Sequence, residues 1–216
     1  TIEQPIFENL VFPDLGKREE ALWSLLFYAG YLKVLSTELT SFERIAKFAI
    51  PNKEVSFVYN QIVVGWFSET MGWSIYVDFL QSLVNAEMNQ FKKYLSDYIQ
   101  SLSYYDFNKN TTEQMFHIFV LGLIAGLKGA YHVQSNQESG FGRFDIILLP
   151  KDKKTRGIVL EFKKNENKDQ LLEKANSALE QIKDKRYIEI FKNHGITSVL
   201  AIGLAFCGKE IELVHE

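Results

Sequence analysis

Cysteine is almost missing from this chain of 216 residues. The single cysteine, Cys207, excludes both an internal disulfide framework and a zinc cluster built from cysteines, and we expect it to be a small, buried hydrophobe at a strand end. The lack of disulfides suits a reducing cytoplasm. No apolar run is long enough to span a membrane and the N-terminus has no signal-peptide pattern, so we expect a soluble, cytoplasmic protein with no membrane partner.

A strong excess of one charge is also absent. The formal net charge is −3, which by itself does not indicate a nucleic-acid binder. Residues 1–112 hold 9 Lys and Arg against 13 Asp and Glu, whereas residues 113–216 hold 15 against 14. The basic residues of the second part cluster at 151–156, 163–164 and 183–186. Each cluster is typical of a solvated face, but together they would also form a rim that follows phosphates around an acidic metal site.

Helical periodicity dominates the first half of the chain. We expect helices over residues 19–36, 52–67, 73–84 and 85–102. Gly30 is expected to end or weaken the first of these helices, and a short strand over residues 42–50 meets Pro51. Residues 103–110 form the expected seam between two parts. Residues 1–108 would therefore be a mainly helical N-terminal region that acts as a linker or lid.

Period-two alternation appears in the second half, residues 109–216, and predicts an α/β domain. The expected order is a helix over residues 110–129, strands over 131–137, 143–149 and 157–163, helices over 165–185 and 187–194, and strands over 197–206 and 210–215. The last two strands are expected to form a hairpin that turns at Gly208.

Asp145, Glu161 and Lys163 are unusual because each charge lies within an expected apolar strand. A charge on a buried strand is costly unless it pairs with another charge or holds a metal ion. Glu161 and Lys163 are two residues apart, so they point to the same face of a strand. Two acids and a lysine at one sheet edge indicate a divalent-metal hydrolase site. The alternative is a structural set of cross-strand salt bridges.

Two other polar residues, Glu113 and Arg143, each have two interpretations. Glu113 begins the long helix before the expected strands, where it could reach the same site, but Asn110-x-x-Glu113 also resembles a capping box. Arg143 either contacts phosphate or pairs with Glu138. The four histidines show no metal-ligand spacing, and His117 is expected to pack within its apolar helix.

Four motifs together make the second half resemble the PD-(D/E)XK nuclease superfamily. Glu113 falls early on the helix that precedes the sheet, and residues 138–145 are similar to the E-x-x-x-GR-x-D pattern that leads into the metal-binding strand of the family. Glu161-Phe162-Lys163 matches the (D/E)-x-K motif. Residues 178–182, Ala-Leu-Glu-Gln-Ile, followed by Tyr187, are similar to the A-L-x-Q-I … Y helix of one branch, although Tyr187 is also typical of a core residue.

That branch is the nuclease-like domain at the C-terminus of predicted bacterial AAA-ATPase-like proteins. Residues 25–32 and 50–55 are similar to the segment that links the two domains there. Phe144 stands where the family has proline, a change that leaves the carboxylate of Asp145 in place. No G-x-x-x-x-G-K-[ST] phosphate-binding loop occurs in the chain, so an ATPase partner domain would lie upstream of Thr1.

The resemblance implies both a fold and a metal site. The fold is α/β, a restriction-endonuclease-like core of order α-β-β-β-α-β with a mainly helical N-terminal region. Asp145 and Glu161 would hold Mg²⁺ or Mn²⁺, which prefer carboxylates, water and phosphate as ligands. The carbonyl of Phe162 would be a further ligand, and Glu113 would complete the metal shell through water.

The resemblance also implies an activity. Lys163 would orient the attacking water or stabilise the developing negative charge, and Gln181 would face the site. The expected reaction is metal-dependent hydrolysis of phosphodiester bonds in DNA or RNA, by a monomer or a homodimer. The alternative is a catalytically inactive nuclease-fold domain that serves as a binding or regulatory module of a larger ATPase-linked protein.

Overall fold

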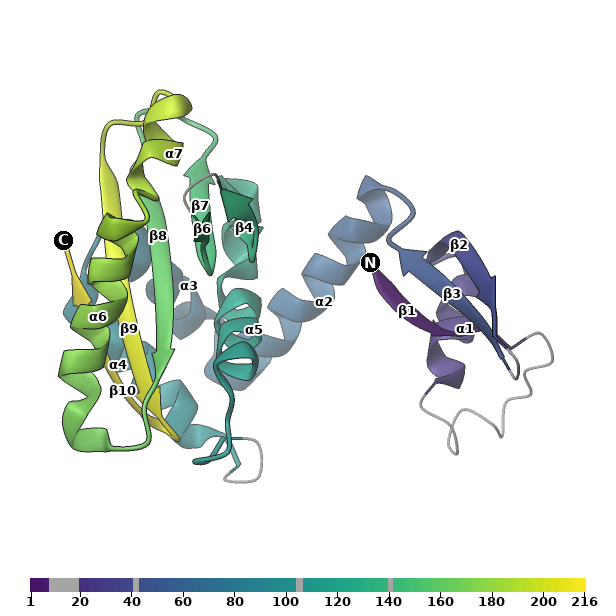
Figure 1. Ribbon diagram of the computed structural model, residues 1–216, viewed down its shortest axis with the longest axis horizontal. Helices are drawn as coiled ribbons and strands as arrows, with labels where there is room; N and C mark the ends of the chain where they lie inside the picture. Colours follow the sequence, from purple (N-terminus) through teal and green to yellow (C-terminus); the bar gives the residue numbers. More distant parts are fainter. Residues whose placement is uncertain (8–19, 41–42, 104–106, 140–141) are drawn as a thin grey trace. The chain divides into compact units, whose positions relative to one another are not determined.

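The computed structural model describes residues 1–7, 20–40, 43–103, 107–139 and 142–216, with the backbone alone at Glu138 and Ser139. Contacts divide the chain into two compact units, Thr1–Ile62 and Val63–Glu216, each with its own hydrophobic core (Figure 1). Among the described residues, no helix is both long and apolar enough to cross a membrane.

The first unit is a small antiparallel sheet packed on one helix. The strand order is β1-β3-β2, with β1 at Ile2–Pro5, β2 at Lys33–Leu39 and β3 at Arg44–Ala49. Helix α1, Ala21–Tyr28, lies against this sheet. Phe48 and Ala46 of β3 are buried in the core together with Leu32. The strand that we expected within residues 42–50 is confirmed as β3.

Helix α1 is shorter than the helix expected over residues 19–36. The backbone of Gly30 adopts a φ of +80°, a left-handed conformation that glycine reaches at little cost and that ends the helix. Residues Lys33–Leu39 then pair with β3, and Leu32 fills the core beneath the sheet. The prediction was wrong after Tyr28 because strand pairing there prevails over helical apolar spacing.

The second unit contains the remaining helices and strands, and α2 (Lys53–Met71) spans the division between the units. Its helices are α3 (Trp73–Val84), α4 (Met88–Ser101), α5 (Glu113–Leu123), α6 (Leu171–Asp184) and α7 (Ile188–Asn193), with short 3-10 helices η2 (Ile124–Gly129) and η3 (Lys168–Gln170). Its strands are β4 (Tyr131–Ser135), β5 (Glu138–Ser139), β6 (Gly142–Arg143), β7 (Ile146–Pro150), β8 (Gly157–Lys164), β9 (Val199–Cys207) and β10 (Glu210–His215).

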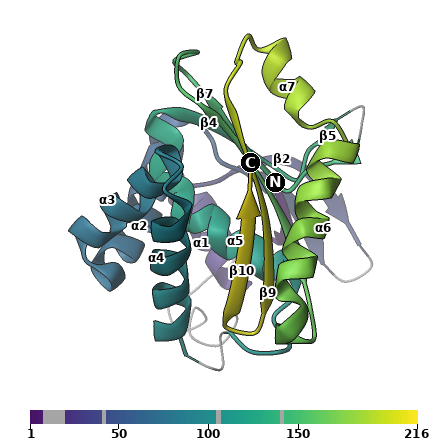
Figure 2. The same cartoon turned by 90° about the vertical axis from the view of Figure 1, so that its left-hand side faces the viewer.

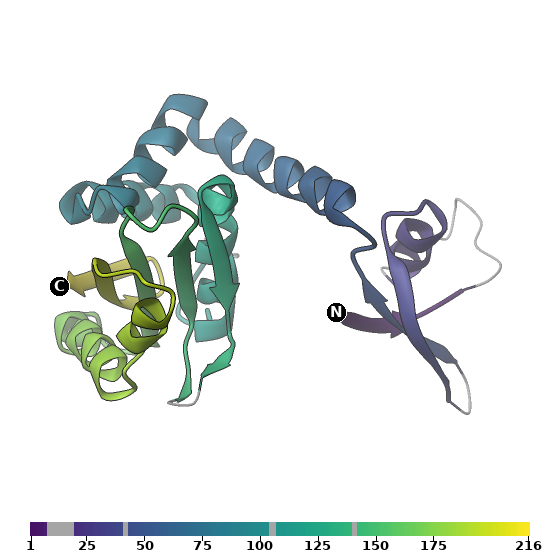
Figure 3. The same cartoon turned by 90° about the horizontal axis from the view of Figure 1, so that it is seen from above.

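Five strands of the second unit form one mixed sheet in the order β10-β9-β8-β7-β4. Only β8 and β9 are parallel, because α6 and α7 form the crossover between them. Even-numbered residues such as Leu160 and Ile202 pack towards α3, α4 and α5, whereas odd-numbered residues such as Val159 and Ala201 pack towards α6 and α7. Figures 2 and 3 show these helix layers on the two sides of the sheet.

Helix α6 lies unusually close to the sheet. A side chain added at Gly203 of β9 would come within 2.2 Å of the backbone oxygen of Ala175 and within 2.5 Å of the backbone nitrogen of Leu179. Only glycine leaves room for this contact. The close approach matters for the site, because α6 also carries Gln181.

The predicted order α-β-β-β-α-β is confirmed for α5, β4, β7, β8, α6 and β9, and β10 completes the predicted hairpin at Gly208. The compact units, however, do not divide at residue 108. Helices α3 and α4 belong to the second unit, because Phe79 and Phe91 are fully buried in the same core cluster as Phe206 of the sheet. Residues 104–106 of the expected seam lie outside the described residues.

Candidate active site

The candidate site lies where β7 stops pairing with β8. Strand β8 pairs with β9 from Gly157 to Lys164, but with β7 only from Ile158 to Leu160. The C-terminal half of β8 therefore presents backbone N–H groups that no strand satisfies on the β7 side. Unpaired N–H groups away from water are costly, so side chains from neighbouring elements are needed there.

Two carboxylates satisfy these N–H groups. Asp145, which immediately precedes β7, accepts the N–H of Phe162 at Oδ2 over 2.8 Å. Glu113, at the start of α5, accepts the N–H of Lys164 at Oε2 over 3.2 Å. The two donors are two residues apart on one strand, a separation of about 6.7 Å. The start of β7 and the start of α5 thus bring two acids to one edge of β8.

Glu113 does not form the capping box that its sequence spacing allowed. Thr112 is the N-cap of α5, and its Oγ1 accepts the N–H of Met115 over 3.2 Å. Glu113 is therefore the first helical residue rather than the third, and its carboxylate turns towards β8. The capping interpretation with Asn110 was wrong because the helix begins two residues later than that interpretation requires.

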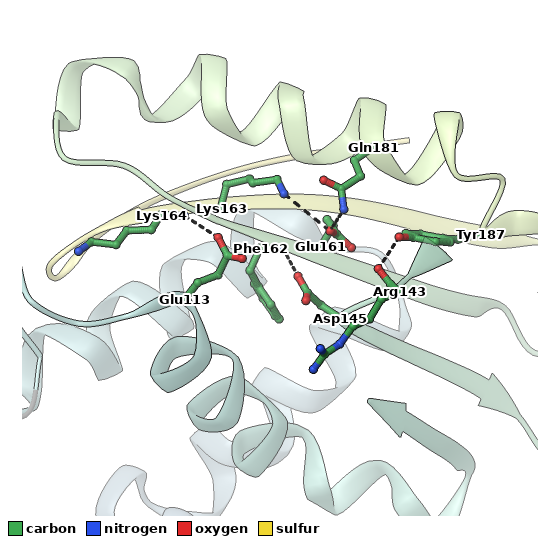
Figure 4. A network of polar contacts seen from close by, with 9 residues as sticks. All are labelled: Glu113, Arg143, Asp145, Glu161, Phe162, Lys163, Lys164, Gln181 and Tyr187. Carbon is green, nitrogen blue, oxygen red and sulfur yellow. Dashed lines mark hydrogen bonds and ion pairs between the residues drawn. The ribbon is translucent and has the colours of Figure 1, made fainter. Parts of the chain in front are cut away.

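Glu161 is the most deeply buried acid of the site, with only 3% of the residue exposed. Figure 4 shows Gln181 of α6 and Lys163 of β8 on either side of its carboxylate. Gln181 donates from Nε2 to Oε1, and the ammonium of Lys163 lies 3.9 Å from the same oxygen. The second oxygen, Oε2, is buried and accepts no hydrogen bond from any described residue. One half of this carboxylate is therefore available to a cation.

The electrostatics of the acid pair reflect its burial. Burial, and next the charge of Asp145, raise the pKa of Glu161 to about 8. Burial also raises the pKa of Asp145, although the Phe162 N–H and the positive charges nearby oppose this shift. Each acid disfavours the ionised form of the other, as expected for two carboxylates that share one site. A bound cation would relieve both costs.

All five side chains predicted for the site border one cleft of about 390 Å³. Its lining residues are Glu113, Gln114, His117, Asn136, Arg143, Asp145, Glu161, Lys163 and Gln181. The side chain of Phe162 is instead buried in the core, and only its backbone belongs to the site. Its carbonyl projects from β8 towards the same edge as its N–H, because both groups of a strand residue point to one side.

The comparison with known families agrees with this geometry. Residues 111–216 match the family model of the PD-(D/E)XK nuclease superfamily. They form a PD-(D/E)XK nuclease superfamily domain. The matched range contains every residue that borders the cleft. Comparison with curated proteins gave no match.

Three residues that border the cleft of the PD-(D/E)XK domain were not predicted as part of the site: Gln114, His117 and Asn136. His117 is buried, as expected, but its ring contacts Ser135 Oγ at 3.0 Å and Asn136 Nδ2 at 3.1 Å beside the cleft. Asn136 has a left-handed φ of +51° and donates its backbone N–H to the carbonyl of Asp145 over 3.0 Å. His117 thus supports the turn that positions Asp145. Its spacing of four residues from Glu113, one helical turn, was the available signal.

Arg143 borders the cleft, and Tyr187 contacts the backbone of Arg143 from the core. Tyr187 is fully buried, packs edge-on against Phe144 and donates its hydroxyl to the carbonyl of Arg143 over 2.5 Å. The prediction of a core role for Tyr187 is confirmed. The side chain of Arg143 is exposed at the cleft. The side chain of Glu138, its expected partner, lies outside the described part of the chain, as do residues 140–141.

The donor set fits a hard divalent cation with a partly aqueous shell. No group of three or more His, Cys, Asp or Glu side chains is placed to hold a metal ion within the ranges that the structure describes. Mg²⁺, however, usually keeps several waters and binds through one or two carboxylates. The unpartnered Oε2 of Glu161, the neighbouring carboxylate of Asp145 and the carbonyl edge of Phe162 supply such a set.

Proposed function

We propose that this protein is a metal-dependent nuclease that hydrolyses phosphodiester bonds of DNA or RNA in the cleft of its PD-(D/E)XK domain. The observation that carries the proposal is the buried acid pair, in which Oε2 of Glu161 has no partner among the described residues. A cation at this point would neutralise the pair, and the cationic side chains of Lys163 and Arg143 border the same cleft. An acidic pocket with a cationic border suits a bound metal ion and a phosphate group.

The residues of the site divide into ligands and supporting groups. Asp145, Glu161 and the carbonyl of Phe162 would hold Mg²⁺ or Mn²⁺, and Glu113 would contact the shell through water. A divalent cation supplies Lewis acidity, which lowers the pKa of a coordinated water and offsets charge on the phosphate. Gln181 holds the carboxylate of Glu161 in place through its amide.

Lys163 is the residue best placed to act on the reacting phosphate. Its ammonium lies 3.9 Å from Oε1 of Glu161, and its side chain is 28% exposed, so one side faces the acid and the other the cleft. A fixed positive charge there orients water or stabilises negative charge that develops on the phosphate. Arg143, exposed at the cleft, would bind a phosphate oxygen through its planar guanidinium.

The proposal is tested by cleavage of labelled single-stranded and duplex DNA and RNA with Mg²⁺ or Mn²⁺. We expect Asp145→Asn and Glu161→Gln each to lower the rate at least about 100-fold, because each removes charge that the cation requires. Glu180→Gln is the matched control, since Glu180 is exposed on α6 and forms only a surface pair with Lys183. Cleavage that survives both site substitutions undiminished would contradict the proposal.

A second candidate function is a non-catalytic domain that serves as a binding or regulatory module of a larger ATPase-linked protein. The nearly balanced charge of residues 113–216, with 15 Lys and Arg against 14 Asp and Glu, favours it over a strong nucleic-acid binder. A calorimetric titration with Mn²⁺ separates the two functions. An inactive scaffold has no reason to bind the ion at Asp145 and Glu161, whereas a nuclease must bind it there.

A further inference from the structure

A second cleft of the PD-(D/E)XK domain lies near the turn between β7 and β8. It has a volume of about 370 Å³. His132 and Gln134 of edge strand β4 form one side, Lys151 and Lys153 of the β7–β8 turn form another, and His194 comes from the end of α7. No carboxylate borders this cleft among the described residues. Leu149, Pro150 and Ile196 complete the lining. The two lysines are its only fully charged groups among the described residues, so the cleft favours an anion.

The two clefts are neighbours along β4. In the register of β4 and β7, His132 is opposite Leu149 and Gln134 is opposite Ile147, and both partners pack towards α6 and α7. Strand side chains alternate, so His132 and Gln134 project to that same face. Gln134 borders the second cleft and Asn136, two residues further on, borders the candidate active site. The path from one cleft to the other follows a single strand.

The basic residues around the second cleft are not neutralised by acids. Within the part of the chain that the structure describes, no ion pair is formed by Lys128, Lys151, Lys153, Lys154 or Arg156. Several lysines elsewhere in this unit do pair, among them Lys92 with Glu212 and Lys192 with Glu189. Two of these five cations, Lys151 and Lys153, border the second cleft.

The turn that carries these cations is well fixed. Asp152, the acid within it, accepts the N–H of Lys154 over 3.0 Å. Lys151 donates to the carbonyls of Lys128 and Gly129, each over 2.8 Å, which ties the turn to η2. Lys153 and Lys154 remain exposed, with their ammonium groups unpaired within the described chain. A rigid turn with two exposed cations holds positive charge in a defined place.

We propose that this second cleft binds phosphates of the same nucleic-acid strand that enters the candidate active site. The inference rests on the proposed nuclease function and extends it to the substrate. Asp145 and Leu149 are four residues apart, about 13 Å along β7, a length that spans about four nucleotides of a duplex strand. The preferred substrate is thus an oligonucleotide long enough to cover both clefts, rather than a dinucleotide.

The test compares Lys153→Ala/Lys154→Ala with a matched control, Lys109→Ala/Lys174→Ala, which removes two exposed lysines away from both clefts. Binding of a fluorescent oligonucleotide of about 20 nucleotides is measured by anisotropy at several salt concentrations. If two phosphate contacts are lost, the slope of log K against log salt falls by about 1.4–1.8. The control pair should leave the slope unchanged.

Kinetics give a second readout. On the long oligonucleotide, the Lys153→Ala/Lys154→Ala protein should show a KM raised several-fold with little change in kcat. On bis(4-nitrophenyl) phosphate, which is too small to reach the second cleft, it should match the wild type.

An equal effect of both double variants, or loss of inorganic phosphate binding without loss of oligonucleotide affinity, would overturn the inference. A wild-type protein that binds the oligonucleotide but never cleaves it would refute the nuclease function alone, since the salt slope still reports the cleft.

Discussion

At the scale of single residues, the account depends on Glu161. A carboxylate that is 3% exposed and has one unpartnered oxygen is costly in its ionised form, and the described contacts offset only part of this cost. Gln181 and Lys163 both contact Oε1, whereas Oε2 is buried and has no partner among the described residues. The arrangement thus leaves Oε2 of Glu161 as a ligand for a cation.

The cost of this charge predicts a pH dependence of stability in the metal-free protein. The pKa of Glu161 in the folded protein is about 8, above its usual value of 4.5. Protonated Glu161 therefore contributes to the free energy of unfolding. This contribution is fully present below about pH 4.5 and is lost as pH rises through about 8. Thermal unfolding in EDTA should therefore show a stability loss of a few kcal/mol over this range, since one pKa unit corresponds to about 1.4 kcal/mol.

Glu161→Gln removes the titrating group and is the control for that experiment. It should be at least as stable as the wild type at about pH 8 and should lose less stability between about pH 5 and pH 8. The other titrating groups remain in both proteins, so the difference between the two curves isolates Glu161. Parallel curves for the two proteins would show that the buried carboxylate carries no such cost.

At the scale of elements, the sequence predicted what depends on local pattern. The alternation of residues 143–149 and 157–163 predicted β7 and β8, and the spacing of Glu161 and Lys163 predicted their common side. The late start of β7, at Ile146 rather than Arg143, was not predictable, because pairing with β8 fixes it. The hydrogen bond from Asn136 to Asp145 was not predictable either, because it depends on the left-handed backbone of Asn136 and not on a periodic pattern.

The start of α5 gives a prediction that separates the two capping interpretations. Thr112→Ala removes the side chain that accepts the Met115 N–H, and should destabilise the protein by about 1 kcal/mol. Asn110→Ala should cost clearly less, because Asn110 is exposed and does not cap the helix. Denaturant unfolding of both variants measures the difference. A larger loss of stability for Asn110→Ala than for Thr112→Ala would instead support a capping box between Asn110 and Glu113.

At the scale of the whole molecule, the start of the family match and the start of the compact unit are two different boundaries. The family match begins at residue 111, close to the boundary predicted at residue 108. The compact unit begins earlier, at Val63, because the even-numbered face of the sheet needs α3 and α4 to cover it. A sequence pattern shows where each amphipathic helix is, but it does not show which sheet the helix covers.

Fragments of the chain should therefore differ in stability. We expect fragment 63–216 to fold cooperatively on its own. The fully buried side chains that fragment 109–216 loses include Phe79, Leu83, Phe91 and Leu95. At about 1.5–3 kcal/mol each, their loss removes roughly 6–12 kcal/mol, which is comparable with the total stability of a domain. Circular dichroism and thermal melting measure the outcome, and an equally stable fragment 109–216 would show that α3 and α4 are dispensable.

The most direct test of the central claim is a calorimetric titration of the whole chain with Mn²⁺. The account predicts saturable binding at one site of the wild type, retained in Glu180→Gln and abolished in the double variant Asp145→Asn/Glu161→Gln. Loss of binding together with an unchanged circular dichroism spectrum would assign the cation to the buried acid pair. Equal heats for the wild type and the double variant would contradict the account, because these two carboxylates would then not hold the metal ion.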